Sequence, residues 1–175
     1  MGIFNKKVKI TPESMGLVVC ETARCRIESL IKDCKENNIE YKIAPLEIYT
    51  FTYNFFLIEK VLIKKHDKIT VSKIIDSAFN NFYNMCEKSF DKNDMILIKK
   101  EIKIRYEVLE KIIEKQSMGT FDNYIRDITK LFIIDITGDD NSYLNEIHVM
   151  TIFINIVNWI KFSEFLLSDY KIKLN

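Results

Sequence analysis

The sequence predicts an all-α fold, a single-domain bundle of about six helices with an apolar C-terminal helix at its centre. Three observations favour this class. The stretch 142–167 is apolar around its whole circumference, several earlier segments carry apolar residues every three or four positions, and the chain has only 4 Gly and 2 Pro among 175 residues. Helical spacing predicts buried helix faces, and few Gly and Pro leave little material for the turns of a sheet protein.

The first helix is expected to follow a flexible, basic N-terminal segment, residues 1–10, and to open a single helical domain, residues 11–175. Thr11-Pro12-Glu13 supplies a capping hydroxyl, a proline suited to the first helical position and an acid in the first turn. An apolar stripe at intervals of three and four continues to Glu36, and Asn37-Asn38 predicts the end of the helix.

The second segment, from Ala44-Pro45 to about Lys65, is open to two interpretations. Within residues 49–55, aromatic and polar side chains alternate as they do in a half-buried strand. The same rings, with Leu46 and Val61, also form one face of a helix. We favour the helix, because the segment is longer than an ordinary strand and no partner strand is evident elsewhere.

Three further helices are predicted by their apolar stripes. The third is capped by Thr70 and runs to about Lys88; the fourth follows Asp91 or Asn93 and runs to about Gln116; the fifth runs from Phe121 to Ile136 and stops before Gly138. The outer face of the fourth is rich in Lys and Glu, which indicates a solvated surface. Residues 139–142 then lead into the sixth helix.

The sixth and central helix, Ser142–Leu167, has aliphatic and aromatic side chains on every side of a helical wheel. Such a helix either spans a membrane or lies inside a soluble bundle. The stretch is long enough to cross a bilayer, but it contains Lys161 and Glu164, and a charge near mid-bilayer costs about 3 kcal/mol or more. We therefore expect a bundle core and no membrane span.

The charge and the cysteine content limit the functions and the cellular compartments that we expect for this protein. The 26 basic and 25 acidic residues give a net charge of +1, so no overall field would attract a nucleic acid, and we expect no such partner. The N-terminus lacks the apolar region of a signal peptide, and the four cysteines, Cys20, Cys25, Cys34 and Cys86, show no CxxC spacing. These features predict a cytoplasmic protein whose thiols lie mainly in its core.

Two stretches resemble binding motifs in part. Residues 69–78 match the first half of a helix-turn-helix, but Asn80-Asn81-Phe82 continue the helical pattern where the turn should lie. Asp135–Glu146 has the length of a calcium loop, but its sixth position is Asp140, where such loops need glycine. We prefer to explain the second stretch as a glycine stop followed by an acidic helix start, and calcium binding stays a minor alternative.

No catalytic motif is evident. His66 and His148 lack the spacing of a helical zinc pair, and no nucleophile elbow, phosphate-binding glycine loop or dinucleotide fingerprint is present. We assign no catalytic, cofactor-binding or metal residue and expect a non-enzymatic protein without a cofactor. An enzyme whose carboxylates meet only in the folded state is a lesser alternative.

The amount of apolar surface predicted for the helices suggests how the protein works. The aromatic run Tyr49–Phe56 and the sixth helix carry more apolar surface than one small bundle can enclose, so a partner should cover part of it. The leading hypothesis is a protein–protein interaction or self-association module, most simply a homodimer. The main alternative is a ligand-binding or sensor bundle with an apolar pocket lined by Tyr49, Tyr53 and Phe56.

Overall fold

The computed structural model describes residues 8–115, 121–141, 145–168 and 170–172, which form six helices and two short strands. The predicted all-α single-domain bundle is confirmed. In chain order the elements are β1 (Val8–Ile10), α1 (Pro12–Glu36), α2 (Ile43–Ile63), α3 (Lys68–Cys86), α4 (Lys92–Lys115), α5 (Phe121–Thr137), α6 (Glu146–Ser168) and β2 (Tyr170–Ile172). Residues 49–55 lie in α2, so the helical interpretation of this segment holds.

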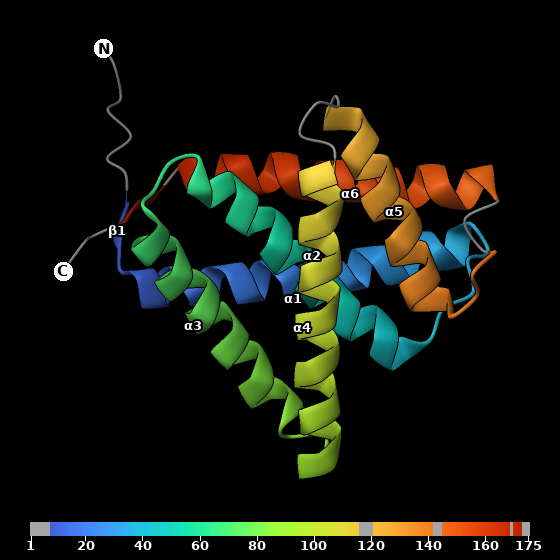
Figure 1. Ribbon diagram of the computed structural model, residues 1–175, viewed down its shortest axis with the longest axis horizontal. Coiled ribbons are helices and arrows are strands. Elements are labelled where there is room, and N and C mark those ends of the chain that lie inside the picture. Colours follow the sequence, from blue (N-terminus) through green and yellow to red (C-terminus); the bar gives the residue numbers. More distant parts are fainter. Residues whose placement is uncertain (1–7, 116–120, 142–144, 169, 173–175) are drawn as a thin grey trace.

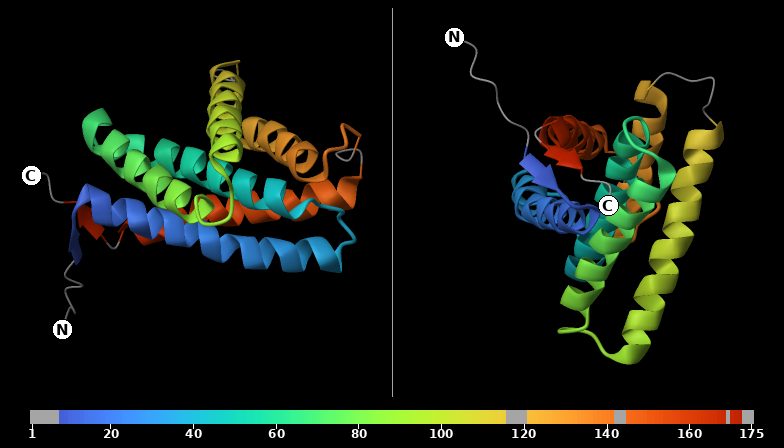
Figure 2. Two further views of the ribbon diagram at one scale, coloured as in Figure 1. Left: turned by 90° about the horizontal axis from the view of Figure 1, so that it is seen from below. Right: turned by 90° about the vertical axis from the view of Figure 1, so that its left-hand side faces the viewer.

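Helix α2 lies at the centre of the bundle and packs against α1, α3, α4, α5 and α6 (Figure 1). Every residue from Thr50 to Ile58 is buried. In Figure 2, α1 and α6 lie on one side of the molecule and α4 on the other, with α2, α3 and α5 between them. The polar residues that alternate with the rings are buried as well, and the side chains of Thr52 and Asn54 donate to backbone carbonyls one turn earlier in the helix.

The structure corrects the expectation that the C-terminal helix is central. One side of α6 packs against α5, α2 and α1, while its other side exposes large apolar residues. The sequence alone did not show which of the two helices is central, because α2 and α6 are both apolar around their circumference. Within the described residues, no helix combines the length and the apolar character that a membrane crossing requires.

Side-chain caps mark the starts of α1, α3 and α6, whereas α2 starts without one, and the cap of α3 differs from the predicted residue. Thr11 caps α1 by accepting a hydrogen bond from the backbone N–H of Ser14 at 3.2 Å, as predicted. Helix α3 is capped by Asp67 rather than Thr70, whose backbone N–H donates to the Asp67 carboxylate at 2.9 Å. Helix α6 is capped by Asn145, whose Oδ1 accepts from the N–H of Ile147 at 3.0 Å.

Helices α1 and α3 approach closely at Gly16. A Cβ placed on Gly16 would lie 2.5 Å from the Cβ of Ser77 and 2.7 Å from the carbonyl oxygen of Ile74, closer than real Cβ atoms come. The Ser77 hydroxyl donates to the carbonyl of Glu13 across the same contact, at 2.9 Å. A glycine is therefore required at position 16 for the two helices to touch.

The two strands join segments from opposite ends of the chain. Residues 8–10 of β1 pair in parallel with residues 170–172 of β2, in the register Val8 to Tyr170 and Ile10 to Ile172. Figure 1 shows this pair beside the start of α1. The sequence did not reveal it, because three residues are too few to show an alternating pattern.

Candidate functional site

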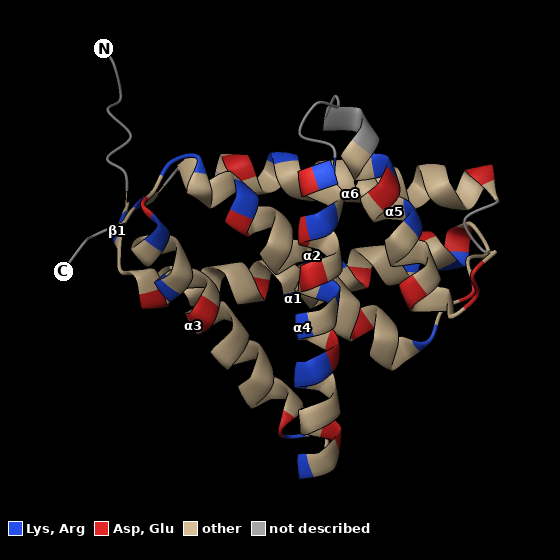
Figure 3. Ribbon diagram, in the orientation of Figure 1, with Lys and Arg blue, Asp and Glu red and all other residues tan. Residues whose placement is uncertain are grey.

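The most conspicuous surface is a line of exposed apolar side chains on α6, which we call the α6 stripe. Its members are Ile147, Met150, Ile154, Phe162 and Phe165, with exposed fractions of 45 to 65%. At 3.6 residues per turn these positions, with the exposed Asn158 and Lys161, fall within about a third of the helix circumference. Figure 3 shows few charged residues on α6, in contrast to the many on α4.

The opposite side of α6 holds the helix in the bundle. Ile152, Ile156 and Trp159 are buried, and the Trp159 ring meets Phe132 of α5 edge to face, with centroids 5.8 Å apart. Asn155 Nδ2 donates to a carboxylate oxygen of Asp33 on α1 at 2.9 Å. These contacts fix the rotation of α6, so the α6 stripe is presented outward on a rigid element.

The aromatic residues proposed to line an apolar ligand pocket are used in packing instead. Tyr53 and Phe56 are fully buried, Tyr53 against Phe132 at 4.9 Å and Phe56 against Tyr106 at 5.4 Å between ring centroids. Tyr49 is half-buried and donates from its hydroxyl to Glu101 at 3.0 Å. The rings therefore contribute to the core, and the apolar-pocket alternative loses its main support.

A buried polar network joins α2, α4 and α5. Asp135 accepts a hydrogen bond from the Tyr53 hydroxyl at 2.6 Å and pairs with the Arg105 guanidinium at 2.5 Å. Only 3% of the Asp135 side chain and 16% of the Arg105 side chain are exposed. Burial raises the pKa of Asp135 to about 6, although the Tyr53 hydroxyl and the Arg105 charge both oppose the rise.

The network also bears on the calcium-loop alternative. Asp135, the first residue of that loop, lies inside α5 and points to Arg105. Residues 142–144 of the loop lie outside the described residues. No group of three or more His, Cys, Asp or Glu in the described part of the chain is arranged to hold a metal ion. The segment resembling a helix-turn-helix lies within the continuous helix α3.

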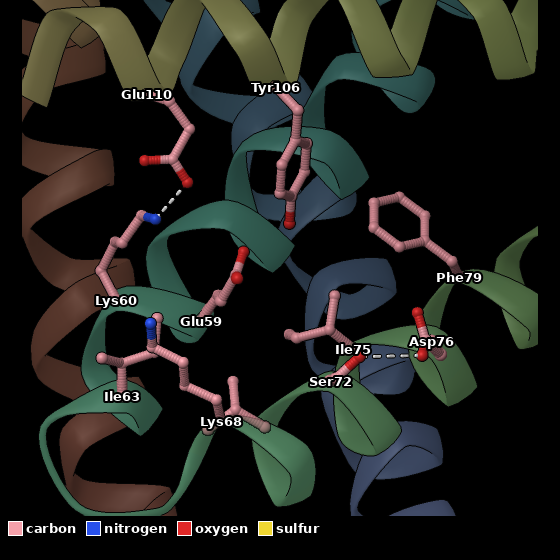
Figure 4. A pocket seen from close by; sticks show the side chains of 11 residues that line it. Glu59, Lys60, Ile63, Lys68, Ser72, Ile75, Asp76, Phe79, Tyr106 and Glu110 are labelled. Carbon is pink, nitrogen blue, oxygen red and sulfur yellow. Dashed lines mark hydrogen bonds and ion pairs between the residues drawn. The ribbon is translucent and has the colours of Figure 1, made fainter.

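A cavity of about 380 Å³ lies between α2, α3 and α4 (Figure 4). Its apolar wall is formed by Val71, Ile75 and Phe79, and its polar lining by Glu59, Lys60, Lys68, Ser72, Asp76, Tyr106 and Glu110. Lys60 forms an ion pair with Glu110, and the Ser72 hydroxyl donates to Asp76 at 3.1 Å. This cavity is where carboxylates from different helices meet, which the sequence could not show.

Three of the four cysteines are buried, as expected for core thiols. Cys20, Cys34 and Cys86 lie in the core, Cys25 is exposed, and all four are free thiols. Burial raises the pKa of Cys20 and Cys34 to about 12. A thiol with so high a pKa is a poor nucleophile at neutral pH, so these two cysteines serve packing.

No protein-family model, curated protein or solved structure matches this chain. The function is therefore inferred from the geometry of the α6 stripe and of the cavity.

Proposed function

We propose that the protein is a non-enzymatic, cytoplasmic self-association module that forms a homodimer through the α6 stripe. The observation that carries this proposal is the exposure of five large apolar side chains along one side of a helix whose other side is packed. Exposed apolar patches of this kind on a soluble domain usually mark a protein interface. A second copy of the chain supplies a matching apolar surface.

The spacing of the α6 stripe favours an antiparallel pair of α6 helices. Ile147 and Phe165 lie nine residues on either side of position 156, Met150 and Phe162 six, and Ile154 and Asn158 two. A two-fold axis at position 156 would therefore place each aliphatic residue of one copy opposite an aromatic or amide residue of the other. Such self-complementarity is what an isologous dimer requires.

The size of the α6 stripe is sufficient for a modest interface. From residue 147 to residue 165 the helix rises about 27 Å, at 1.5 Å per residue. Five large side chains about half exposed on each of two copies would bury on the order of 1,000 Å², near the lower limit for a specific interface. The polar Asn158 next to the axis would disfavour shifted registers, as buried Asn does in coiled coils.

Sedimentation velocity over a range of concentrations tests the proposal. The wild type should sediment as a dimer, and Ile154→Glu should convert it to a monomer, because two carboxylates would enter the centre of the interface. Leu97→Glu is the matched control. Leu97 is also exposed, with a fraction of 63% against 51% for Ile154, but lies on α4, so this variant should remain a dimer.

A second variant tests the antiparallel register. Adding Asn158→Lys to Ile154→Glu places opposite charges across the predicted axis, so the double variant should dimerise again. A wild type that remains a monomer at every accessible concentration would contradict the proposal. Retention of the dimer by Ile154→Glu would show that another surface mediates association.

A further inference from the structure

The cavity between α2, α3 and α4 holds polar groups that folding leaves without partners. The Tyr106 hydroxyl is buried and has no hydrogen-bond partner in the described part of the chain. Glu59 is half-buried, and none of the ion pairs among the described residues includes it. A buried polar group without a partner costs free energy, so the Tyr106 hydroxyl needs an explanation, and the Glu59 carboxylate lines the same cavity outside any ion pair.

The charges around the cavity favour a cationic ligand. Three carboxylates, Glu59, Asp76 and Glu110, share the lining with two lysines. Lys60 is committed to Glu110 and lies 4.7 Å from the centroid of the Phe56 ring. Lys68 is an exposed residue of the cavity lining. Glu59 and Asp76 therefore face the cavity as acceptors, and Figure 4 shows the Tyr106 ring directed from α4 toward Glu59.

The apolar wall of the cavity favours a ligand that also has an apolar part. Val71 and Ile75 are buried beneath the cavity, and the rings of Phe79 and Tyr106 meet edge to face with centroids 5.5 Å apart. Aromatic faces attract cations as well as apolar groups. A volume of about 380 Å³ falls in the range of small-molecule sites.

We propose that this cavity binds a small organic amine, with its ammonium group donating to the Glu59 carboxylate and the Tyr106 hydroxyl oxygen and its apolar body against Val71, Ile75 and Phe79. The ammonium would form an ion pair with Glu59 and donate the hydrogen bond that the Tyr106 hydroxyl lacks. This inference goes beyond self-association, because the cavity residues belong to α2, α3 and α4 and not to α6.

Three probes of similar shape test the charge preference. Benzylamine is a cation, benzyl alcohol is neutral, and benzoate is an anion. In two-dimensional ¹H–¹⁵N NMR titrations of the full chain, benzylamine should shift the amide signals of residues around Glu59, Asp76 and Tyr106 and reach saturation. Benzyl alcohol should bind at least tenfold more weakly. Equal binding of the alcohol, tighter binding of benzoate, or shifts spread evenly over the surface would overturn the proposal.

Two variants test the residues assigned to the ammonium. Glu59→Gln should weaken benzylamine binding at least tenfold, and Tyr106→Phe about three- to tenfold. Glu47→Gln is the control, because Glu47 is an exposed residue of the same helix that does not line the cavity. It removes the same charge and should leave the affinity unchanged. Unchanged affinity in Glu59→Gln, or an equal loss in Glu47→Gln, would contradict the assignment even if one variant folded poorly.

Discussion

Arg105 shows how one residue can determine whether a buried carboxylate is tolerated. Its guanidinium pairs with Asp135 and lies 5.5 Å from the centroid of the Tyr49 ring, so it contacts both α5 and α2 from α4. The residue is one of four arginines in a chain whose other cations are Lys. Arg is preferred for buried pairs because its planar group binds carboxylates and stacks on rings. The presence of Arg instead of Lys at position 105 was the one feature of the sequence that pointed to this network.

Arg105→Met should lower the free energy of unfolding by about 3–5 kcal/mol at pH 7, because it leaves the Asp135 carboxylate buried without a counter-charge. Chemical denaturation would measure the loss. Arg24→Met is the control, since the Arg24–Glu21 pair is exposed and should contribute less than about 1 kcal/mol. Adding Asp135→Asn to Arg105→Met should recover most of the loss, and failure to recover would show that Arg105 acts mainly through packing.

Asp135 should also give stability a distinct pH dependence. Its folded pKa, about 6, lies above the ordinary value of 3.8, so the folded state holds this proton more tightly than the unfolded state. The stabilisation is complete below about pH 4 and is lost as pH rises through 6, a change of about 3 kcal/mol. Urea unfolding of wild type and Asp135→Asn between pH 4 and 7 would measure it. The variant should lack this decline; identical profiles would contradict the raised pKa.

The Tyr106 hydroxyl is predicted to lower stability in the free protein. It is buried without a hydrogen-bond partner among the described residues, so Tyr106→Phe should raise the free energy of unfolding by up to about 1 kcal/mol. Tyr53→Phe provides the contrast, because the Tyr53 hydroxyl donates to Asp135 and its removal should be destabilising. A destabilised Tyr106→Phe would indicate that its hydroxyl has a partner after all.

At the scale of elements, the contact of α1 with α3 depends on the absence of a side chain. Gly16→Ala should raise helix propensity by about 1 kcal/mol, yet the new methyl would overlap Ser77 and the Ile74 carbonyl. We expect a net destabilisation of about 1–3 kcal/mol from this overlap, measured by thermal or urea unfolding. Ser29→Ala, at an exposed position of α1, should be neutral or slightly stabilising. A stabilised Gly16→Ala would show that the helices can move apart at little cost.

Helical periodicity predicted all six helices, because a single buried face leaves its mark every three or four residues. It placed the starts less well. Asp67 and Asn145 cap α3 and α6, whereas Thr70, which the sequence favoured, donates its N–H to Asp67. Neighbouring Asp, Asn, Ser and Thr residues are all competent caps, and the choice among them depends on tertiary packing.

The sites could not be predicted because they form only when separate helices come together in the folded molecule. The cavity draws Glu59, Asp76 and Tyr106 from three helices, and no local pattern records that they meet. The α6 stripe was expected only as an apolar excess, since the exposed side of a uniformly apolar helix depends on what packs against it. Central α2 and lateral α6 have the same kind of sequence and different surroundings.

Substitution of Trp159 distinguishes the core of the molecule from the proposed interface. The side chain is 1% exposed and packs on Phe132 within one chain. Trp159→Ala should therefore lower the free energy of unfolding by about 3–5 kcal/mol without dissociating the proposed dimer. Denaturation would measure the first effect and sedimentation at native pH the second. A fall in mass while the protein remains folded would place Trp159 at the interface instead.

The pairing of β1 with β2 has a consequence for biosynthesis. Val8 and Tyr170, which lie side by side, are about 160 residues apart in the chain, so a ribosome working at about 5–20 residues per second needs on the order of 10–30 s to make the second after the first. During that interval α1 can meet α2 and α3, but β1 remains an unpaired edge. The β1–β2 pair therefore forms only after translation has passed residue 172.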